Sequence, residues 1–170
     1  MIILFPTELE AAPFRAIYPD AEVFICGVGM AQTAACVARL LADGHRSFLL
    51  AGIAGAYDQT LAKGEVVAVA EERVAGMPQR FDRAYKTSIL PDGLRVVRSN
   101  TVSACGADAQ GAEVENMEGA ALFALCEEFG AECCEIRAIS NRVGEPRVEW
   151  DVPTALENLA HAVQQIISKQ

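Results

Sequence analysis

The chain alternates short, continuously apolar runs with segments of helical character, and this alternation restricts the fold more than any other feature of the sequence. A strand that is apolar at nearly every position is covered on both faces, whereas a strand with one wet face alternates apolar and polar residues. The runs expected to form strands are residues 1–5, 22–26, 47–51, 65–70, 94–98 and 133–139. The pattern predicts an α/β protein, a three-layer α/β/α sandwich with a mixed, largely parallel central sheet.

Helix signals separate the predicted strands. The segment Thr7-Glu8-Leu9-Glu10 has the form of a capping box and opens a helix that reaches about Ile17. Further helices are expected at residues 30–42 and 117–129 and from Pro153 to the C-terminus, and loops at residues 103–112 and 140–151. Residues 71–93 match no regular element.

Glycine-rich or polar turns follow four of the strands. These turns are Pro6–Glu10, Gly27–Gly29, Gly52–Gly55 and Ser140–Asn141. Ligands of open α/β sheets bind beyond the carboxyl ends of the strands. We therefore expect the four turns to meet at one site.

The composition excludes several classes of protein. The chain has 170 residues, the size of one domain, and residues 1–170 are expected to form it. The net charge is −9 and no cluster of Lys and Arg is present, which argues against a nucleic-acid surface. No apolar stretch approaches the ~18 residues of a membrane span, and the N-terminus lacks the basic lead of a signal peptide. We expect a cytoplasmic protein that binds neither nucleic acid nor membrane.

Cysteine, histidine and glycine patterns give no sign of a metal or cofactor. The six cysteines form no CxxC motif, and we interpret them as reduced core residues. The two histidines, His45 and His161, lie apart from them in the sequence and predict no zinc site. Gly27-Val28-Gly29 resembles the start of a dinucleotide fingerprint, but Gln32 stands where the third glycine would fall. We therefore expect the protein to need no cofactor.

Five segments, taken in order, carry a family resemblance. They are Thr7-Glu8-Leu9-Glu10, Gly27-Val28-Gly29-Met30, Gly52-Ile53-Ala54-Gly55, Val114-Glu115-Asn116-Met117-Glu118-Gly119-Ala120-Ala121 and Ile136-Arg137-Ala138-Ile139-Ser140-Asn141. Together they resemble the nucleoside phosphorylase and nucleosidase superfamily, and within it the futalosine hydrolases. The resemblance implies a phosphorylase/hydrolase-like fold, a homodimer and no cofactor. It also implies hydrolysis of the N-ribosidic bond of a purine nucleoside, futalosine, with release of hypoxanthine in a route to menaquinone.

The resemblance assigns catalytic roles to two residues. Glu10 would take the proton of the attacking water, although the capping box gives the same side chain a structural use. Asn141 would stabilise the departing base. Related nucleosidases that act on adenine carry aspartate at this position, and an asparagine amide can donate to N7 and reach a 6-oxo group. The asparagine favours a 6-oxopurine such as hypoxanthine, unless it only caps a loop.

The resemblance assigns substrate binding to a second group of residues. Glu118 would accept hydrogen bonds from the ribose hydroxyls, or it is an acidic residue favoured near a helix start. Met117 would pack on the ribose, or it belongs to the core. The remaining predicted contacts are Ile53, Ala54, Gly55, Ser140 and Trp150.

Two alternatives remain open. A phosphorylase needs cations for phosphate, but the turns near Gly27 and Gly52 carry no arginine. A nucleoside-binding homologue without activity is the other alternative, because the chain is shorter than typical family members. The missing residues are expected near 75–80 and in 103–112, which leaves Phe81 and residues 101–102 as candidates for base contact.

Overall fold

The computed structural model describes residues 1–169 and contains one eight-stranded sheet and four α-helices within them. The elements, in chain order, are β1 (Ile2–Phe5), α1 (Glu8–Ile17), β2 (Val23–Ile25), α2 (Met30–Ala42), β3 (Ser47–Ala56), β4 (Val66–Val74), β5 (Ala84–Lys86), β6 (Arg95–Thr101), β7 (Val114–Asn116), α3 (Gly119–Phe129), β8 (Glu132–Arg142) and α4 (Val152–Ile167). Short 3₁₀ turns lie at Gln79–Phe81 and Arg147–Glu149.

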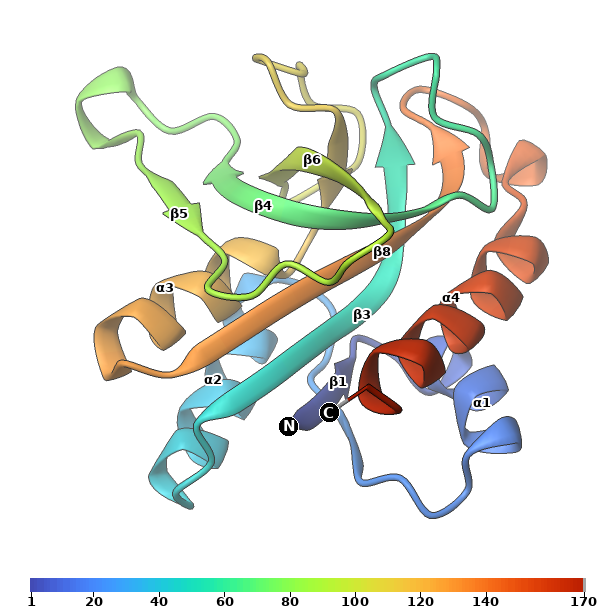
Figure 1. Cartoon of the computed structure of the whole chain (residues 1–170). Coiled ribbons are helices and arrows are strands. Elements are labelled where there is room, and N and C mark those ends of the chain that lie inside the picture. Colours follow the sequence, from blue (N-terminus) through green and yellow to red (C-terminus); the bar gives the residue numbers. More distant parts are fainter. Residues whose placement is uncertain (170) are drawn as a thin grey trace.

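The sheet is mixed, which confirms the predicted class. β1 pairs in parallel with β2 and β3, and β3 pairs in parallel with β8. Antiparallel ladders join β3 to β7, β4 to β5 and β4 to β8. Strands β3, β7, β6, β4 and β8 close a hydrogen-bonded circuit, because β8 pairs with both β3 and β4. In the view of Figure 1, β4 crosses β3 and β8, and β6 lies beside β4. The three-layer description predicted from the sequence leaves out this circuit.

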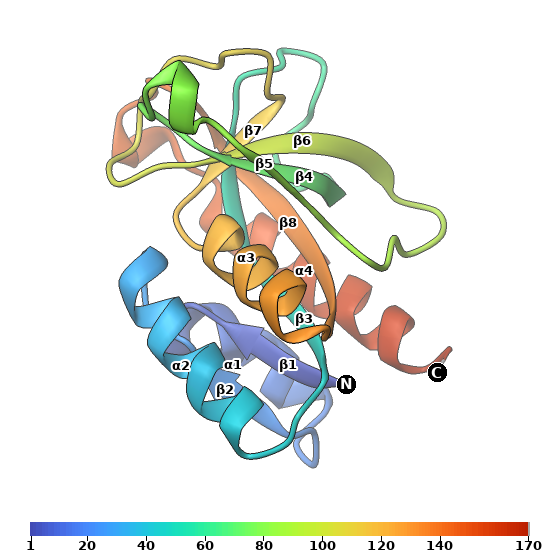
Figure 2. The same ribbon diagram turned by 90° about the vertical axis from the view of Figure 1, so that its left-hand side faces the viewer.

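Two hydrophobic clusters lie on opposite faces of the long strands. One joins α2 and α3 to the sheet through residues such as Leu40 and Phe123. The other joins α1 and α4 to it through residues such as Phe14 and Leu159. Figure 2 shows α2 and α3 together in front of the strands, with α4 behind them. Both faces of the strands are therefore dry, which is why their apolar runs are continuous.

Strands β3 and β8 are longer than predicted. They extend past the expected ends at residues 51 and 139 to Ala56 and Arg142, and their pairing is irregular between Ala54 and Gly55. The loop predicted at residues 140–151 therefore begins only after Arg142, and its first three residues belong to the strand. Local composition did not predict these strand ends, because their residues are small and polar. The pairing partners that make them strands are distant in sequence. The extension places Asn141 opposite Gly55.

The helix predicted at residues 117–129 begins two residues later. A short strand that was not predicted, β7, precedes it, and Met117 and Glu118 form the turn between strand and helix. The Asn116 side-chain oxygen accepts hydrogen bonds from the backbone N–H groups of Glu118 and Gly119, both at 2.8 Å. This cap fixes the turn at the edge of the sheet.

The cysteine prediction holds for part of the set. All six cysteines are free thiols, and Cys26, Cys126, Cys133 and Cys134 are buried. Cys36 is half-buried and packs against a core cluster, whereas Cys105 is exposed on the loop before β7 and is not a core residue. None of the helices found in residues 1–169 is long and apolar enough to cross a membrane.

Gly119 is a tightly packed point of the fold, and its replacement tests the packing. A Cβ atom there would collide with carboxylate oxygens of Glu72 and Glu135, both fully buried. Helix propensity alone favours alanine over glycine by about 1 kcal/mol, but overpacking a rigid interior costs about 1–3 kcal/mol. We expect Gly119→Ala to lower the free energy of unfolding, measured by urea denaturation.

The matched control is Glu128→Ala, at an exposed position on the same helix. It should change stability by no more than about 0.5 kcal/mol. A Gly119→Ala protein as stable as the wild type would show that the two carboxylates move aside freely.

Candidate active site

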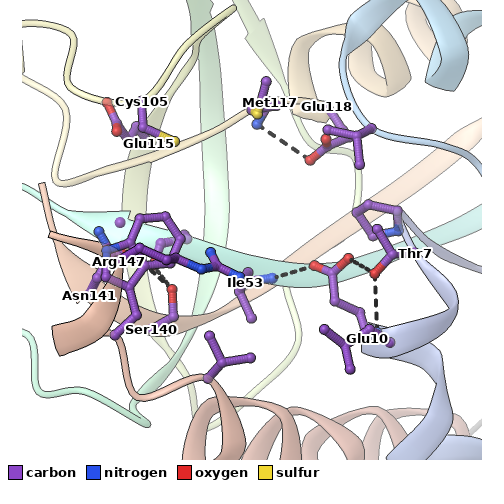
Figure 3. A pocket seen from close by; sticks show the side chains of 17 residues that line it. Thr7, Glu10, Ile53, Cys105, Glu115, Met117, Glu118, Ser140, Asn141 and Arg147 are labelled. Carbon is purple, nitrogen blue, oxygen red and sulfur yellow. Dashed lines mark hydrogen bonds between the residues drawn. The ribbon is translucent and has the colours of Figure 1, made fainter.

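A cavity of about 270 Å³ opens where the predicted turns meet. It lies at the ends of β1, β3 and β8 and beside the turn between β7 and α3. All nine predicted site residues line it, and Figure 3 shows several of them facing the same space. They are Glu10, Ile53, Ala54, Gly55, Met117, Glu118, Ser140, Asn141 and Trp150.

Glu10 is held by both of its carboxylate oxygens. One accepts a hydrogen bond from the Thr7 hydroxyl at 2.6 Å, and the other from the Ile53 backbone N–H at 3.1 Å. The Thr7 oxygen also accepts from the Glu10 N–H at 3.2 Å and so caps α1. Glu10 therefore takes part in the helix cap and also lines the cavity.

Burial raises the pKa of Glu10 above its ordinary value. The side chain is 7% exposed, and desolvation disfavours its charged form. The hydrogen bonds from Thr7 and Ile53 oppose this effect by stabilising the carboxylate, without cancelling it. A carboxylate with a raised pKa is a stronger base than one in water.

Glu118 lies on the same side of the cavity as Glu10 and is fixed by three donors (Figure 3). Its oxygens accept from the Gly29 N–H at 2.9 Å, the Met117 N–H at 3.3 Å and an Arg137 guanidinium nitrogen at 3.2 Å. A carboxylate offers about four lone-pair sites, so it can still accept from a ligand. These donors hold the Glu118 carboxylate in a fixed orientation. The residue is 4% exposed and lines the cavity, so a ligand can reach it.

Arg137 lies beneath the cavity and is fully buried. Besides Glu118, it donates to Glu135 at 2.7 Å and to the Asn116 side-chain oxygen at 2.9 Å. Burial opposes its charge, but Glu135 and Glu118 outweigh this effect and raise the pKa of Arg137. The residue was part of a quoted motif without a predicted role. Its signal was available, since a single arginine in an apolar strand needs buried carboxylate partners.

Asn141 lies at the end of β8 with its side-chain amide oriented by neighbours. Its oxygen accepts from the Ser140 hydroxyl at 2.8 Å, and its nitrogen donates to the Arg142 carbonyl at 2.9 Å. An amide nitrogen has two hydrogens, so one N–H remains for a ligand. A Cβ at Gly55 would lie 3.2 Å from the Asn141 nitrogen, so glycine permits this close approach.

Trp150 and Arg147 form a stacked pair at the same side of the cavity as Asn141. The guanidinium carbon lies 4.2 Å from the centre of the indole ring, a cation–π contact. The indole N–H donates to the Glu145 carbonyl at 3.1 Å. Figure 3 shows Arg147, Asn141 and Ser140 across the cavity from Glu10. Arg147 was not predicted as a site residue.

Comparison with known proteins gives the family. The family model described as "Phosphorylase superfamily" matches residues 98–168. The futalosine hydrolase of Thermus thermophilus is 31% identical over 215 residues, which cover 99% of this chain and 96% of that protein. The chain belongs to the futalosine hydrolase family. It is thus an N-glycosidase of the nucleosidase type.

A second futalosine hydrolase, from Acidothermus cellulolyticus, is 37% identical over 75 residues, which cover 39% of this chain and 31% of that protein. The 215 positions of the Thermus alignment exceed the 170 residues of this chain, so that relative carries residues that this family member lacks.

Solved structures share the fold over nearly the whole chain. A futalosine hydrolase mutant of Helicobacter pylori superposes with a TM-score of 0.87 at 16% identity, covering 99% of this chain and 98% of that one. The 5'-methylthioadenosine/S-adenosylhomocysteine nucleosidase of Helicobacter pylori superposes with a TM-score of 0.86 at 15% identity, covering 99% and 97%. The closed strand circuit is therefore placed within a known nucleosidase fold.

Sequence reasoning missed several residues that line the cavity of this futalosine hydrolase family member. Glu115 accepts from the Tyr57 hydroxyl at 2.6 Å and from the Gly106 N–H at 2.8 Å, which ties the 103–112 loop to β7. The other unpredicted lining residues are Pro6, Thr7, Leu9, Val28, Cys105, Arg147 and Val152. Phe81 and residues 101–102, the candidates for base contact, are not among the lining residues. Within residues 1–169 no group of three metal-ligating side chains is arranged around an ion site.

Thr7→Val tests how Glu10 is tuned. The change removes the hydroxyl that stabilises the Glu10 carboxylate, so the pKa of Glu10 should rise further. NMR titration of ¹³C-labelled glutamate carboxyl groups measures it. Thr7→Ser keeps the hydroxyl and should leave the titration near that of the wild type. A Thr7→Val titration that matches the wild type would contradict the assigned hydrogen bond.

Proposed function

We propose that this protein hydrolyses the N-ribosidic bond of futalosine and releases hypoxanthine. The observation that carries the proposal is the placement of Glu10 and Glu118 at one side of the cavity and of the Asn141 amide at the other (Figure 3). This arrangement fits a nucleoside, whose ribose would lie beside the two carboxylates and whose base would lie beside the Asn141 amide. The family membership supports the same reaction.

In the proposed mechanism Glu10 accepts a proton from water as the water attacks the anomeric carbon. Cleavage of the N-ribosidic bond develops an oxocarbenium-like sugar, so a carboxylate on the attacking side both activates water and faces the growing positive charge. The raised pKa of Glu10 makes its carboxylate a stronger base for this proton transfer.

The remaining predicted residues hold the nucleoside. Glu118 accepts hydrogen bonds from the ribose hydroxyls, and Met117 packs on the sugar. The backbone of Ile53, Ala54 and Gly55 borders the substrate closely. Asn141, oriented by Ser140, donates to the purine as negative charge moves onto it. Trp150 covers the nucleoside from the loop before α4.

Water is a better candidate than phosphate as the nucleophile. Phosphate needs cationic donors near the attacking position. Arg147 is the arginine among the lining residues, and it lies across the cavity from Glu10 (Figure 3). Arg137 is engaged by Glu118, Glu135 and Asn116. Two carboxylates near the attacking position would also repel an anion.

The deciding measurement is release of free base from futalosine, inosine and methylthioadenosine, by chromatography with and without phosphate. Hypoxanthine from futalosine in the absence of phosphate is the expected result. Strict dependence on phosphate would instead make the protein a phosphorylase. No base from any substrate, with thermal stabilisation by nucleosides, would make it a nucleoside-binding homologue without activity.

Glu10→Gln tests the proposed base. The amide cannot accept the water proton, so kcat should fall by about 10²–10⁴-fold, the usual worth of general base catalysis. Glu8→Gln, at an exposed position on the same helix, is the control and should leave kcat unchanged. An unaltered kcat in the Glu10 variant would remove this residue from the mechanism.

Asn141→Asp tests recognition of the base. A protonated aspartic acid can donate to N7 but offers a poorer match to a 6-oxo group than the amide does. The kcat/KM ratio of the 6-amino analogue of futalosine to futalosine should rise about tenfold, the value of one hydrogen bond of roughly 1.4 kcal/mol. Asn158→Asp, on α4 and outside the residues that line the cavity, is the control and should leave this ratio unchanged. An unchanged ratio would contradict the proposed contact.

We also propose that the protein works as a cytoplasmic homodimer in menaquinone biosynthesis. Leu9 and Val28 line the cavity and are 62% and 46% exposed, which supports a covering partner. The residues that this chain lacks are proposed to fall near 75–80 and in 103–112. Light scattering coupled to size exclusion chromatography measures the assembly state.

A further inference from the structure

A buried group of charges that the proposed mechanism does not use lies behind Glu118. Glu72 on β4, Glu135 on β8 and Arg137 on β8 are all fully buried. Buried carboxylates are expensive unless each is paired and hydrogen-bonded. The hydrogen-bond partners of the two glutamates therefore indicate whether each carboxyl is charged or protonated.

The two glutamates are satisfied unequally. Glu72 accepts from the Thr101 hydroxyl at 2.6 Å through one oxygen and from the Asn116 amide through the other. Glu135 accepts from Arg137 at 2.7 Å through Oε1. Its Oε2 is the buried side-chain atom, among residues 1–169, that has no hydrogen-bond partner.

The partnerless oxygen faces the other glutamate. A Cβ placed on Gly119 would collide with Glu135 Oε2 and with Glu72 Oε1, so both oxygens border the same point beneath the start of α3. Two acceptors that meet in a dry interior repel each other unless a hydrogen lies between them. A proton on one carboxyl would supply that hydrogen and would give Glu135 Oε2 its partner.

Counting charges leads to the same conclusion. Glu72, Glu118 and Glu135 surround a single guanidinium, Arg137. Among residues 1–169, the other side chains that hydrogen-bond around the pair are neutral, namely Ser99 and Thr101 from β6 and Asn116 from β7. Two adjacent buried carboxyls do not both ionise when only one cation is present.

We propose that Glu72 and Glu135 share one proton and act as a positioning pair that holds Arg137, and through it the Glu118 carboxylate, in place. Burial is the main cause of a raised pKa in both glutamates, and their mutual repulsion adds to it for Glu72. The inference rests on the proposed function only for the consequence on ribose binding. The proton itself belongs to the protein without substrate.

The pair should make activity sensitive to alkaline pH. Above the pKa of the pair the proton is lost, both carboxyls are charged, and Arg137 is drawn toward them and away from Glu118. kcat/KM should then fall as pH rises, chiefly through KM. Glu72→Gln cannot ionise at this position, so the alkaline fall should disappear in that variant.

Infrared spectroscopy of the protein without substrate tests the shared proton directly. The wild type at neutral pH should show a carboxylic acid C=O band that shifts in D₂O. Both Glu72→Gln and Glu135→Gln should lose it, because each variant leaves one carboxylate with an amide donor. Glu127→Gln, exposed on α3, is the control and should keep the band. A wild type without the band, or loss in only one variant, would overturn the sharing.

Kinetics with the purified nucleosidase test the positioning. Glu72→Leu should raise KM about tenfold, the effect of losing about 1.4 kcal/mol of binding, and Glu72→Gln should recover most of that loss at neutral pH. Equal losses in the two variants, or an alkaline fall that survives in Glu72→Gln, would overturn the positioning role. If the wild type releases no base, the proposed function fails, but the infrared result still decides whether the proton is shared.

Discussion

The buried guanidinium of Arg137 is the interaction on which the rest of the site depends. A charge taken out of water is tolerated only where hydrogen-bonded partners surround it. Arg137 meets this requirement with Glu135 on its own strand, Asn116 on β7 and Glu118 at the start of α3, and it approaches the Ile53 carbonyl on β3 at 3.4 Å. One side chain thus joins β3, β7, β8 and the start of α3, all of which border the cavity.

Two glycines make this arrangement sterically possible. A Cβ on Gly52 would overlap an Arg137 nitrogen and would lie 3.2 Å from the Glu10 carboxylate, so the missing side chain leaves room for both charged groups. Gly119 does the same for Glu72 and Glu135 at the start of α3. Glycine is therefore required at positions 52 and 119 because charged side chains lie where a Cβ would be. Neither position has a positive φ.

The sequence predicted which residues line the cavity better than it predicted the extent of the strands. Gly and polar turns after apolar runs mark the carboxyl ends of strands, and such ends meet at one edge, so Glu10, Ile53 and Asn141 could be expected together. The extensions of β3 and β8 and the strand β7 depend on pairing with distant segments, which local composition does not reveal. Glu72 escaped notice for a related reason: next to Glu71 it has the pattern of a solvated edge, yet it is fully buried.

The arrangement of charge explains how the proposed chemistry and the buried pair fit together. A cation that develops on the sugar is best stabilised by carboxylates that are already fixed and ionised, since no reorganisation is then needed. From beneath the cavity, Arg137 favours the charged form of Glu10 and forms an ion pair with the Glu118 carboxylate. If Glu72 and Glu135 were both ionised, they would compete for that guanidinium. One proton shared between them leaves enough positive charge facing Glu118, so the protonation of a pair outside the cavity determines the electrostatics within it.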